Sequence, residues 1–292
     1  MTRKWGHSPF AGKRGQAWTT GLKGTVPVLA TALLFCTSSG AADAPLFTDD
    51  FEKHPAGQIP GAPWKEETYK SGAIIKVDAE RAFSGAQAMH VFTPRGANYR
   101  RGYVAIHLAN PVPEARSGMY GRAMVYLDAA PVAVPGAGPV HWTLLQGEGR
   151  SADDRYNSIY RLGVEQRSGT QLMANFETTP PVRTDCKQQS KKTLPLGRWA
   201  CVEWHMEVGT QEMEFWLDGK RVTRVRQRAA APDACKGNDL QGEWRAPPRF
   251  DSLYIGFERY ADSANDQNLW VDDVALSRTR IGCPVRSRGG DR

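Results

Sequence analysis

The sequence predicts an all-β protein built as a two-sheet antiparallel β-sandwich of the jelly-roll type. Three features of the chain after residue 42 indicate this fold. Apolar and polar residues alternate over many short segments, Gly and Pro separate these segments, and no stretch carries an uninterrupted helical spacing of apolar residues. About ten to twelve short strands in one domain are typical of a sandwich of two sheets.

Residues 1–42 are expected to form a signal peptide that is removed. Five Lys or Arg residues and no acid precede an apolar run from Val26 to Cys36, and small residues near Ala42 offer a cleavage site. The run is shorter than the roughly 20 residues that cross a bilayer. A lipoprotein reading at Cys36 is disfavoured by the bulky Phe35 before it. We expect a secreted or periplasmic protein with one domain over residues 43–285 and a disordered basic tail over 286–292.

Charge gives little support for a nucleic-acid surface. The chain has 38 Lys and Arg and 31 Asp and Glu, and five of the basic residues lie in the predicted signal, so the remainder carries 33 − 31 = +2. We therefore expect no binding to nucleic acid. After signal removal we also expect no membrane binding, and the protein is expected to be a monomer.

Four cysteines remain outside the predicted signal, and in an exported chain they indicate two disulfides. They are Cys186, Cys201, Cys235 and Cys283. Spacing does not choose among the three possible pairings. No C-x-x-C or Cys/His cluster is present, which argues against a zinc site.

The strands follow from period-two alternation. It is clear over 103–108, 119–127, 160–165 and 172–177, and again over 253–260 and 269–276. Residues 199–222 read as a hairpin, with Asp218-Gly219 in a turn that tolerates positive φ.

Each sheet of a sandwich buries one face, so the outward residues carry the functional information. This set is rich in Arg, His, Tyr and Asn, which hydrogen-bond and stack on sugars or neutralise carboxylates. We expect about half of it to converge on one groove. The outward residues are Tyr103, His107, Arg122, Tyr126, Arg161, Asn175, Glu177, Glu203, His205, Trp216, Tyr254, Glu258 and Tyr260.

Several segments together resemble a known family. The strand pair at 199–204 and 215–219 looks like that of concanavalin A-like jelly rolls, and the segments 47–52 and 269–274 resemble their paired terminal strands. With Arg280-Ile281-Gly282-Cys283-Pro284, they suggest a bacterial relative of the fungal cellulose-induced secreted jelly-roll proteins, which are similar to glucuronan and alginate lyases. The resemblance covers residues 47–284.

The resemblance implies a structural calcium ion that ties the first strand to the last. Its ligands would be Glu52, Ser84, Gln87 and Asp272, and carboxylates from opposite chain ends would repel without a cation. The alternative is that Asp272 and Asp273 only cap a strand end.

The same resemblance implies a polysaccharide lyase whose substrate is a plant cell-wall polysaccharide or another uronate polymer. Arg122 or Arg161 would neutralise the uronate carboxylate, which acidifies the proton α to it, with Asn175 or Gln146 assisting. His141 would be the base and Tyr260 the acid, or Tyr260 would act as both acid and base. The chain lacks the Gln-x-His tripeptide of the related alginate lyases, and unbroken alternation would put His141 and Gln146 on opposite faces.

Two other functions stay open. One is a non-catalytic, calcium-containing, lectin-like protein, for which aromatic residues such as Trp216 would suffice. The other is a jelly-roll glucanase, because Glu203, His205 and Glu207 alternate on one strand, although Glu203 and Glu207 would be roughly 13 Å apart. The predicted substrate-binding residues are Tyr103, His107, Gln146, Asn175, Glu203, His205, Trp216 and Glu258. No serine-esterase, phosphate-loop or zincin motif appears.

Overall fold

The computed structural model describes residues 44–69, 71–96, 99–136, 138–166, 169–226 and 244–284. These residues belong to one compact unit. They form two antiparallel sheets, and the helical structure within them is a single 3₁₀ turn, η1 (Pro113–Arg116). In the described part of the chain, no helix is long and apolar enough to span a bilayer.

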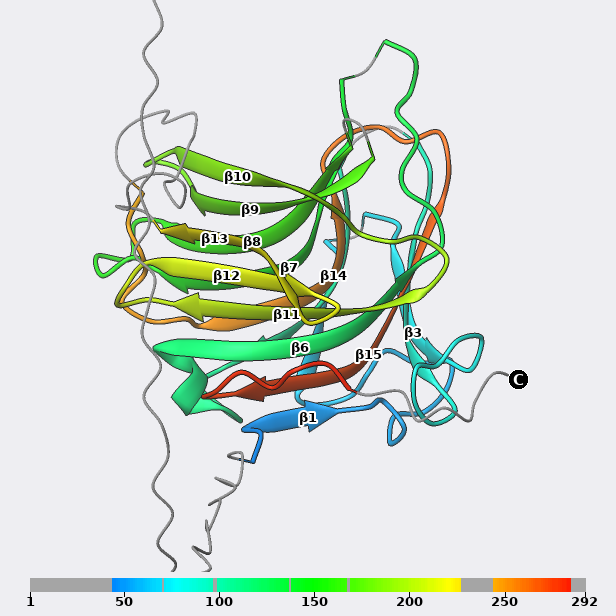
Figure 1. Cartoon of the computed structure of the whole chain (residues 1–292), viewed down its shortest axis with the longest axis horizontal. Coiled ribbons are helices and arrows are strands. Elements are labelled where there is room, and N and C mark those ends of the chain that lie inside the picture. Colours follow the sequence, from blue (N-terminus) through cyan, green and yellow to red (C-terminus); the bar gives the residue numbers. More distant parts are fainter. Residues whose placement is uncertain are drawn as a thin grey trace, which may run out of the picture. The chain divides into compact units, whose positions relative to one another are not determined.

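The first sheet has the order β13-β12-β11-β6-β15-β4-β3, with β1 also paired to β15 (Figure 1). Its strands are β13 (Lys220–Arg226), β12 (Glu212–Leu217), β11 (Trp199–Glu207), β6 (Gly118–Leu127), β15 (Gln267–Ser277), β4 (Ala88–Thr93), β3 (Ile74–Asp78) and β1 (Phe47–Asp49).

The second sheet has the order β10-β9-β8-β7-β14-β5-β2. Its strands are β10 (Thr184–Thr193), β9 (Thr170–Thr178), β8 (Asn157–Gln166), β7 (His141–Arg150), β14 (Ser252–Arg259), β5 (Arg100–His107) and β2 (Trp64–Glu67). The predicted all-β sandwich is therefore confirmed.

The hydrophobic core lies between the sheets because alternate residues of each strand point inward. From the first sheet it takes Trp204 and Phe215, and from the second sheet Trp142 and Phe176, each at most 1% exposed. Burying side chains of this size contributes on the order of 2–3 kcal/mol each. The opposite face of each strand is left for polar residues, and these build the site.

Candidate active site

A cavity of about 280 Å³ opens on the outer face of the second sheet. It spans four neighbouring strands, β7 to β10, and is closed on one side by the residue that follows β14. Its lining residues are His141, Thr143, Arg161, Gly163, Glu165, Met173, Asn175, Glu177, Asp185, Lys187 and Tyr260. Four residues predicted from the sequence, His141, Arg161, Asn175 and Tyr260, therefore line one cavity.

Gly163 lies in the middle of the cavity lining, between two larger residues on neighbouring strands. Gly163 pairs with Thr143 on one side and Met173 on the other. A Cβ at Gly163 would lie 2.7 Å from the backbone oxygen of Trp142, which is closer than real Cβ contacts. Only glycine fits this position without a shift of the sheet.

A β-bulge in β7 brings His141 and Gln146 to the same face. The pairing of β7 with β8 shifts between Thr143 and Leu145, so that His141 opposes Glu165 while Gln146 opposes Arg161. The extra residue reverses the alternation within the strand. The expectation that His141 and Gln146 lie on opposite faces was therefore wrong. Gln146 Oε1 accepts a 2.9 Å hydrogen bond from Arg161 Nε directly beside the cavity.

Three potential catalytic side chains lie against one another. The Tyr260 ring stacks on the His141 ring with centroids 4.9 Å apart and planes 21° apart. The guanidinium of Arg161 lies 5.6 Å from the centre of the Tyr260 ring. Because Tyr260 directly follows β14 and its backbone N donates to the His141 oxygen at 3.3 Å, the sheet itself sets this pairing.

Glu258 fixes the phenol of Tyr260 from behind. It is 1% exposed, and its Oε2 accepts a 2.5 Å hydrogen bond from the Tyr260 hydroxyl. Its Oε1 accepts hydrogen bonds from Tyr99 and, at 3.1 Å, from Arg101. The ion pair with Arg101 offsets part of the cost of burying this carboxylate in the sheet. Glu258, predicted to bind substrate, thus contacts Tyr260 and lies under it.

Electrostatics separate the proton states of the two stacked rings. Partial burial lowers the pKa of His141, so its imidazole is neutral at pH 7 and can accept a proton. Burial, reinforced by the charge of Glu258, raises the pKa of Tyr260, although Arg161 opposes the shift. Tyr260 is therefore a protonated phenol that can give up its proton only as charge develops on an acceptor.

Acidic residues share the cavity with the cations. Arg161 forms an ion pair with Glu177, and Lys187 Nζ lies 3.9 Å from Glu165. Asp185 accepts a hydrogen bond from the amide of Asn175. The cavity lining thus holds three carboxylates and two cations, and an anionic ligand must replace Glu177 or share Arg161 with it.

Four predicted residues lie on the first sheet, away from this cavity. Arg122 is on β6, Glu203 and His205 are on β11, and Trp216 is on β12. Arg122, Glu203 and Trp216 contact a C-terminal segment. The His205 ring stacks on the Tyr120 ring with centroids 4.1 Å apart. The four residues do not join His141 and Tyr260, because the outer faces of the two sheets point in opposite directions.

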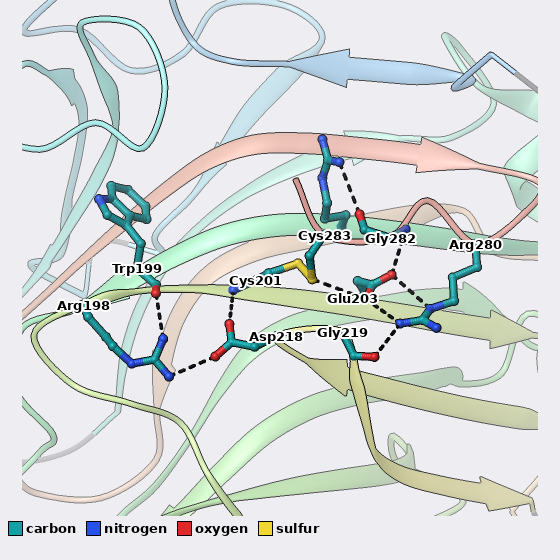
Figure 2. Close-up of a disulfide and its surroundings, with 10 residues drawn as sticks. Arg198, Trp199, Cys201, Glu203, Asp218, Gly219, Arg280, Gly282 and Cys283 are labelled. Atoms are coloured by element: carbon teal, nitrogen blue, oxygen red, sulfur yellow. Dashed lines mark hydrogen bonds and ion pairs between the residues drawn. A yellow bond between two sulfur atoms is a disulfide. The ribbon is translucent and has the colours of Figure 1, made fainter. Parts of the chain in front are cut away.

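The C-terminal segment covers Glu203, as Figure 2 shows. Glu203 is 1% exposed and accepts hydrogen bonds from both Arg280 Nε (3.1 Å) and Nη2 (2.8 Å), and from the backbone N of Gly282 (3.0 Å). Arg122 donates to the Gly282 oxygen, and Arg280 lies over the Trp216 ring at 4.6 Å. These groups anchor the chain end, so the glucanase reading of Glu203, His205 and Glu207 gains no support.

A disulfide joins the same two segments. Cys201 on β11 is bonded to Cys283, across 82 residues of sequence. Cys186 is also disulfide-bonded, and Cys235 lies outside the described residues. The prediction of disulfides is thereby confirmed for Cys186, Cys201 and Cys283.

Two further predicted residues lie on β5. Tyr103 is fully buried and donates a 3.2 Å hydrogen bond to the Thr143 oxygen, so it supports the cavity floor. His107 is exposed at the end of the strand, where its Nδ1 lies 2.9 Å from the Ser252 hydroxyl. Neither side chain lines the cavity.

The four predicted calcium ligands lie around one turn. Glu52 Oε1 accepts hydrogen bonds from the backbone N atoms of Ala86 (2.8 Å) and Gln87 (2.9 Å), and Asp272 Oδ2 accepts from Ser84 (3.1 Å). A Cβ at Gly85 would lie 2.3 Å from Glu52 Oε1, so glycine is needed where the chain passes the carboxylate.

Asp272 is the unusual member of this group. It is fully buried, and no cation forms an ion pair with it among the described residues. Burial raises its pKa to about 7 in spite of three backbone N–H donors. Its hydrogen-bond partners are the backbone N–H groups of Phe83, Ser84 and Asp273. A buried carboxylate is the type of hard oxygen ligand that calcium prefers.

Sequence reasoning missed Thr143, Glu165, Asp185 and Lys187 in the cavity, and Tyr99 and Arg101 beside it. Arg101 could have been found, because it extends the outward alternation of Tyr103 by one step. Asp185 and Lys187 lie on β10, whose polar sequence carries no clear strand signal.

An antiparallel sandwich of two sheets with a polar cavity on one outer face defines the jelly-roll class of protein. A model of the polysaccharide lyase-like family, described as the Cip1-like core domain, matches residues 62–279. The chain therefore belongs to this family. No curated protein sequence matches it.

Solved structures align with the chain at low sequence identity, and the first of the following shares its fold. An endo-β-1,4-glucuronan lyase from the fungus Trichoderma reesei aligns with a TM-score of 0.54 and 13% identity, over 81% of this chain and 96% of that one. The alginate lyase Aly36B aligns with a TM-score of 0.43 and 13% identity, over 77% and 100%. The receptor binding domain of a botulinum neurotoxin C/D mosaic aligns at 0.45 and 9%, over 82% and 49%.

Proposed function

We propose that this protein is an exported polysaccharide lyase that cleaves uronate-containing chains by β-elimination in the cavity of the second sheet. The observation that carries the proposal is the contact of neutral His141 with protonated Tyr260 beside Arg161. A base, an acid and a cation are the three groups that this reaction requires, and they meet within one cavity.

Arg161 would bind the uronate carboxylate. Its Nε is held by Gln146 and its Nη1 faces Glu177, so the guanidinium is fixed in direction. A bound carboxylate would compete with Glu177 for the guanidinium. Neutralising that carboxylate lowers the pKa of the adjacent C–H group, which makes removal of the proton feasible.

His141 and Tyr260 would divide the proton transfers. The neutral imidazole of His141 takes the proton α to the carboxylate, and the electrons of that C–H bond form the new double bond as the glycosidic C–O bond breaks. The leaving oxygen takes the phenolic proton of Tyr260. Before this step the Tyr260 hydroxyl donates to Glu258 Oε2 at 2.5 Å with Thr143 Oγ1 3.0 Å away, so the O–H bond would have to turn from Glu258 toward the leaving oxygen.

Binding without turnover is the second candidate function. The pairing of Arg161 with Glu177 favours it, because the cation that the reaction needs already has a carboxylate partner. A lectin-like protein would still use the polar cavity for a sugar ring. The two candidates differ in whether an unsaturated product appears.

We also propose a structural calcium ion held by Glu52, Ser84, Gln87 and Asp272. The buried carboxylate of Asp272 supports this site. Bound there, the ion would neutralise Asp272 and hold the turn at residues 83–87 to β15. Export is supported by the disulfide of Cys201 and Cys283, since such bonds persist outside reducing compartments.

The test is an elimination assay of the purified protein with calcium on glucuronan, alginate and pectate. The double bond of the product absorbs ultraviolet light, so turnover is followed directly. We expect the absorbance to rise with at least one polymer. Arg161→Ala should abolish this rise, whereas Arg155→Ala, which changes an exposed arginine in the loop before β8, should keep it. Binding with no rise on any polymer would support the lectin-like alternative.

A further inference from the structure

Beside the cavity, an exposed tyrosine is held in place over a buried arginine. Tyr69 is 66% exposed, which is unusual for a large aromatic ring. Its backbone φ is +48°, in the left-handed region that a bulky residue seldom adopts. The Arg101 guanidinium lies 4.3 Å from the centre of the Tyr69 ring. This cation–π contact helps to fix the ring at the surface.

Arg101 itself cannot move freely. It is 6% exposed, pairs with Glu258 at 3.1 Å, and donates from Nε to the Glu67 oxygen at 3.1 Å. Tyr103 and Tyr254 flank its guanidinium at 5.0 and 5.1 Å. The Arg101 guanidinium that contacts Tyr69 is thus held in place by the sheet.

A second exposed tyrosine connects Tyr69 with the cavity. Tyr99 is 37% exposed, its ring lies 6.1 Å from that of Tyr260, and its hydroxyl binds the same Glu258 carboxylate as Arg101. Tyr260 lines the cavity. Tyr69, Tyr99 and Tyr260 therefore share one network of Arg101 and Glu258.

We propose that Tyr69 and Tyr99 form a pyranose-stacking subsite that binds a sugar of the same polysaccharide chain next to the cleaved unit. The inference rests on the proposed function and deepens it. Rigid tyrosines offer a flat apolar face and a polar edge at low entropic cost, which suits the apolar face and hydroxyl rim of a pyranose. The subsite lies on the β14–β5 side of the cavity, opposite the β10 side where Lys187 lies.

The experiment measures binding to glucuronan, alginate and pectate by affinity electrophoresis in a Tyr260→Phe background. The background prevents the polymer from being consumed if the protein is a lyase. Tyr69→Ala and Tyr69→Phe are compared with Tyr120→Ala, which changes a partly exposed tyrosine on the other sheet. We expect Tyr69→Ala to weaken binding by about 3- to 10-fold, and Tyr69→Phe and Tyr120→Ala to stay near the parent.

A separate readout distinguishes this proposal from the proposed function. Ultraviolet assay of the parent protein reports elimination, whereas the electrophoresis reports the subsite even without turnover. Binding of Tyr69→Ala equal to the parent, or a loss as large in Tyr120→Ala, would overturn the subsite. Binding to none of the three polymers would overturn it as well. Circular dichroism of each variant verifies that the fold is kept.

Discussion

The hydroxyl of Tyr260 donates a 2.5 Å hydrogen bond to Glu258, a carboxylate that is buried beneath the ring. Glu258 in turn is held by Arg101 and Tyr99. This arrangement holds the Tyr260 ring on His141 and keeps the phenol protonated, since a nearby negative charge disfavours the phenolate. Two other groups of contacts, around Glu203 and around Asp272, hold the chain ends.

Tyr260→Phe removes the proposed acid and keeps the ring that stacks on His141. We expect kcat for elimination to fall by about 10²- to 10⁴-fold, the usual contribution of general acid catalysis. Polymer affinity should change little. The measurement is steady-state kinetics on the best polymer, with Tyr156→Phe as a control for loss of a hydroxyl in the loop before β8. A variant with parental kcat would remove Tyr260 from the mechanism.

The pH dependence follows from the shifted pKa values. Because the pKa of His141 is lowered, the neutral base persists below a histidine's ordinary value of about 6.5, and the acid limb of kcat/KM should lie there. Because the pKa of Tyr260 is raised, the alkaline limb should lie above the ordinary value of about 10 for tyrosine. Rates across this range provide the measurement. An acid limb that stays in His141→Ala would assign it to another group.

Arg280→Ala should destabilise the fold and spare the chemistry. It leaves the carboxylate of Glu203, which is 1% exposed, without its charged partner, at a cost of roughly 3 kcal/mol. The matched control is Arg198→Ala, which breaks the exposed pair with Asp218 and should cost at most about 1 kcal/mol. Urea unfolding measures both variants. If Arg280→Ala abolished elimination in protein that is still folded, Glu203 would belong to a functional site.

Removal of calcium should lower thermal stability. An ion present at a hundred times its Kd contributes about 2.7 kcal/mol, so EGTA should lower Tm by about 5–10 °C. Asp272→Asn should abolish this response, whereas Asp154→Asn, at an exposed residue, should keep it. The measurement is the Tm of each variant by calorimetry with and without EGTA. A Tm that EGTA does not change would leave Asp272 as a capping residue only.

The alternation of residues predicted the fold well. The outward residues predicted from alternation supplied Arg161, Asn175 and Tyr260 to the cavity, although β14 itself is buried along its whole length. Local alternation contains no information about which strands become neighbours. Arg122 and Arg161 looked equivalent in sequence, and pairing placed them on different sheets.

Two other features could not be read from the pattern. The bulge at Thr143–Leu145 depends on how β7 fits both β8, which follows it in sequence, and β14, which lies far along the chain. The bulge changed the face of Gln146. The burial of Glu203 depends on a segment 77 residues further along the chain, at Arg280. Alternation alone marks Glu203 as an outward, available carboxylate.

Mass spectrometry of the products formed from a defined uronate oligosaccharide tests the central claim most directly. Elimination breaks the chain without adding water, so the masses of the two products should sum to that of the substrate, with the double bond on one of them. The account predicts this result for the parent protein and none for Tyr260→Phe. Products whose summed mass exceeds the substrate by one water would show hydrolysis, and would contradict the assignment of His141, Arg161 and Tyr260 to a lyase site.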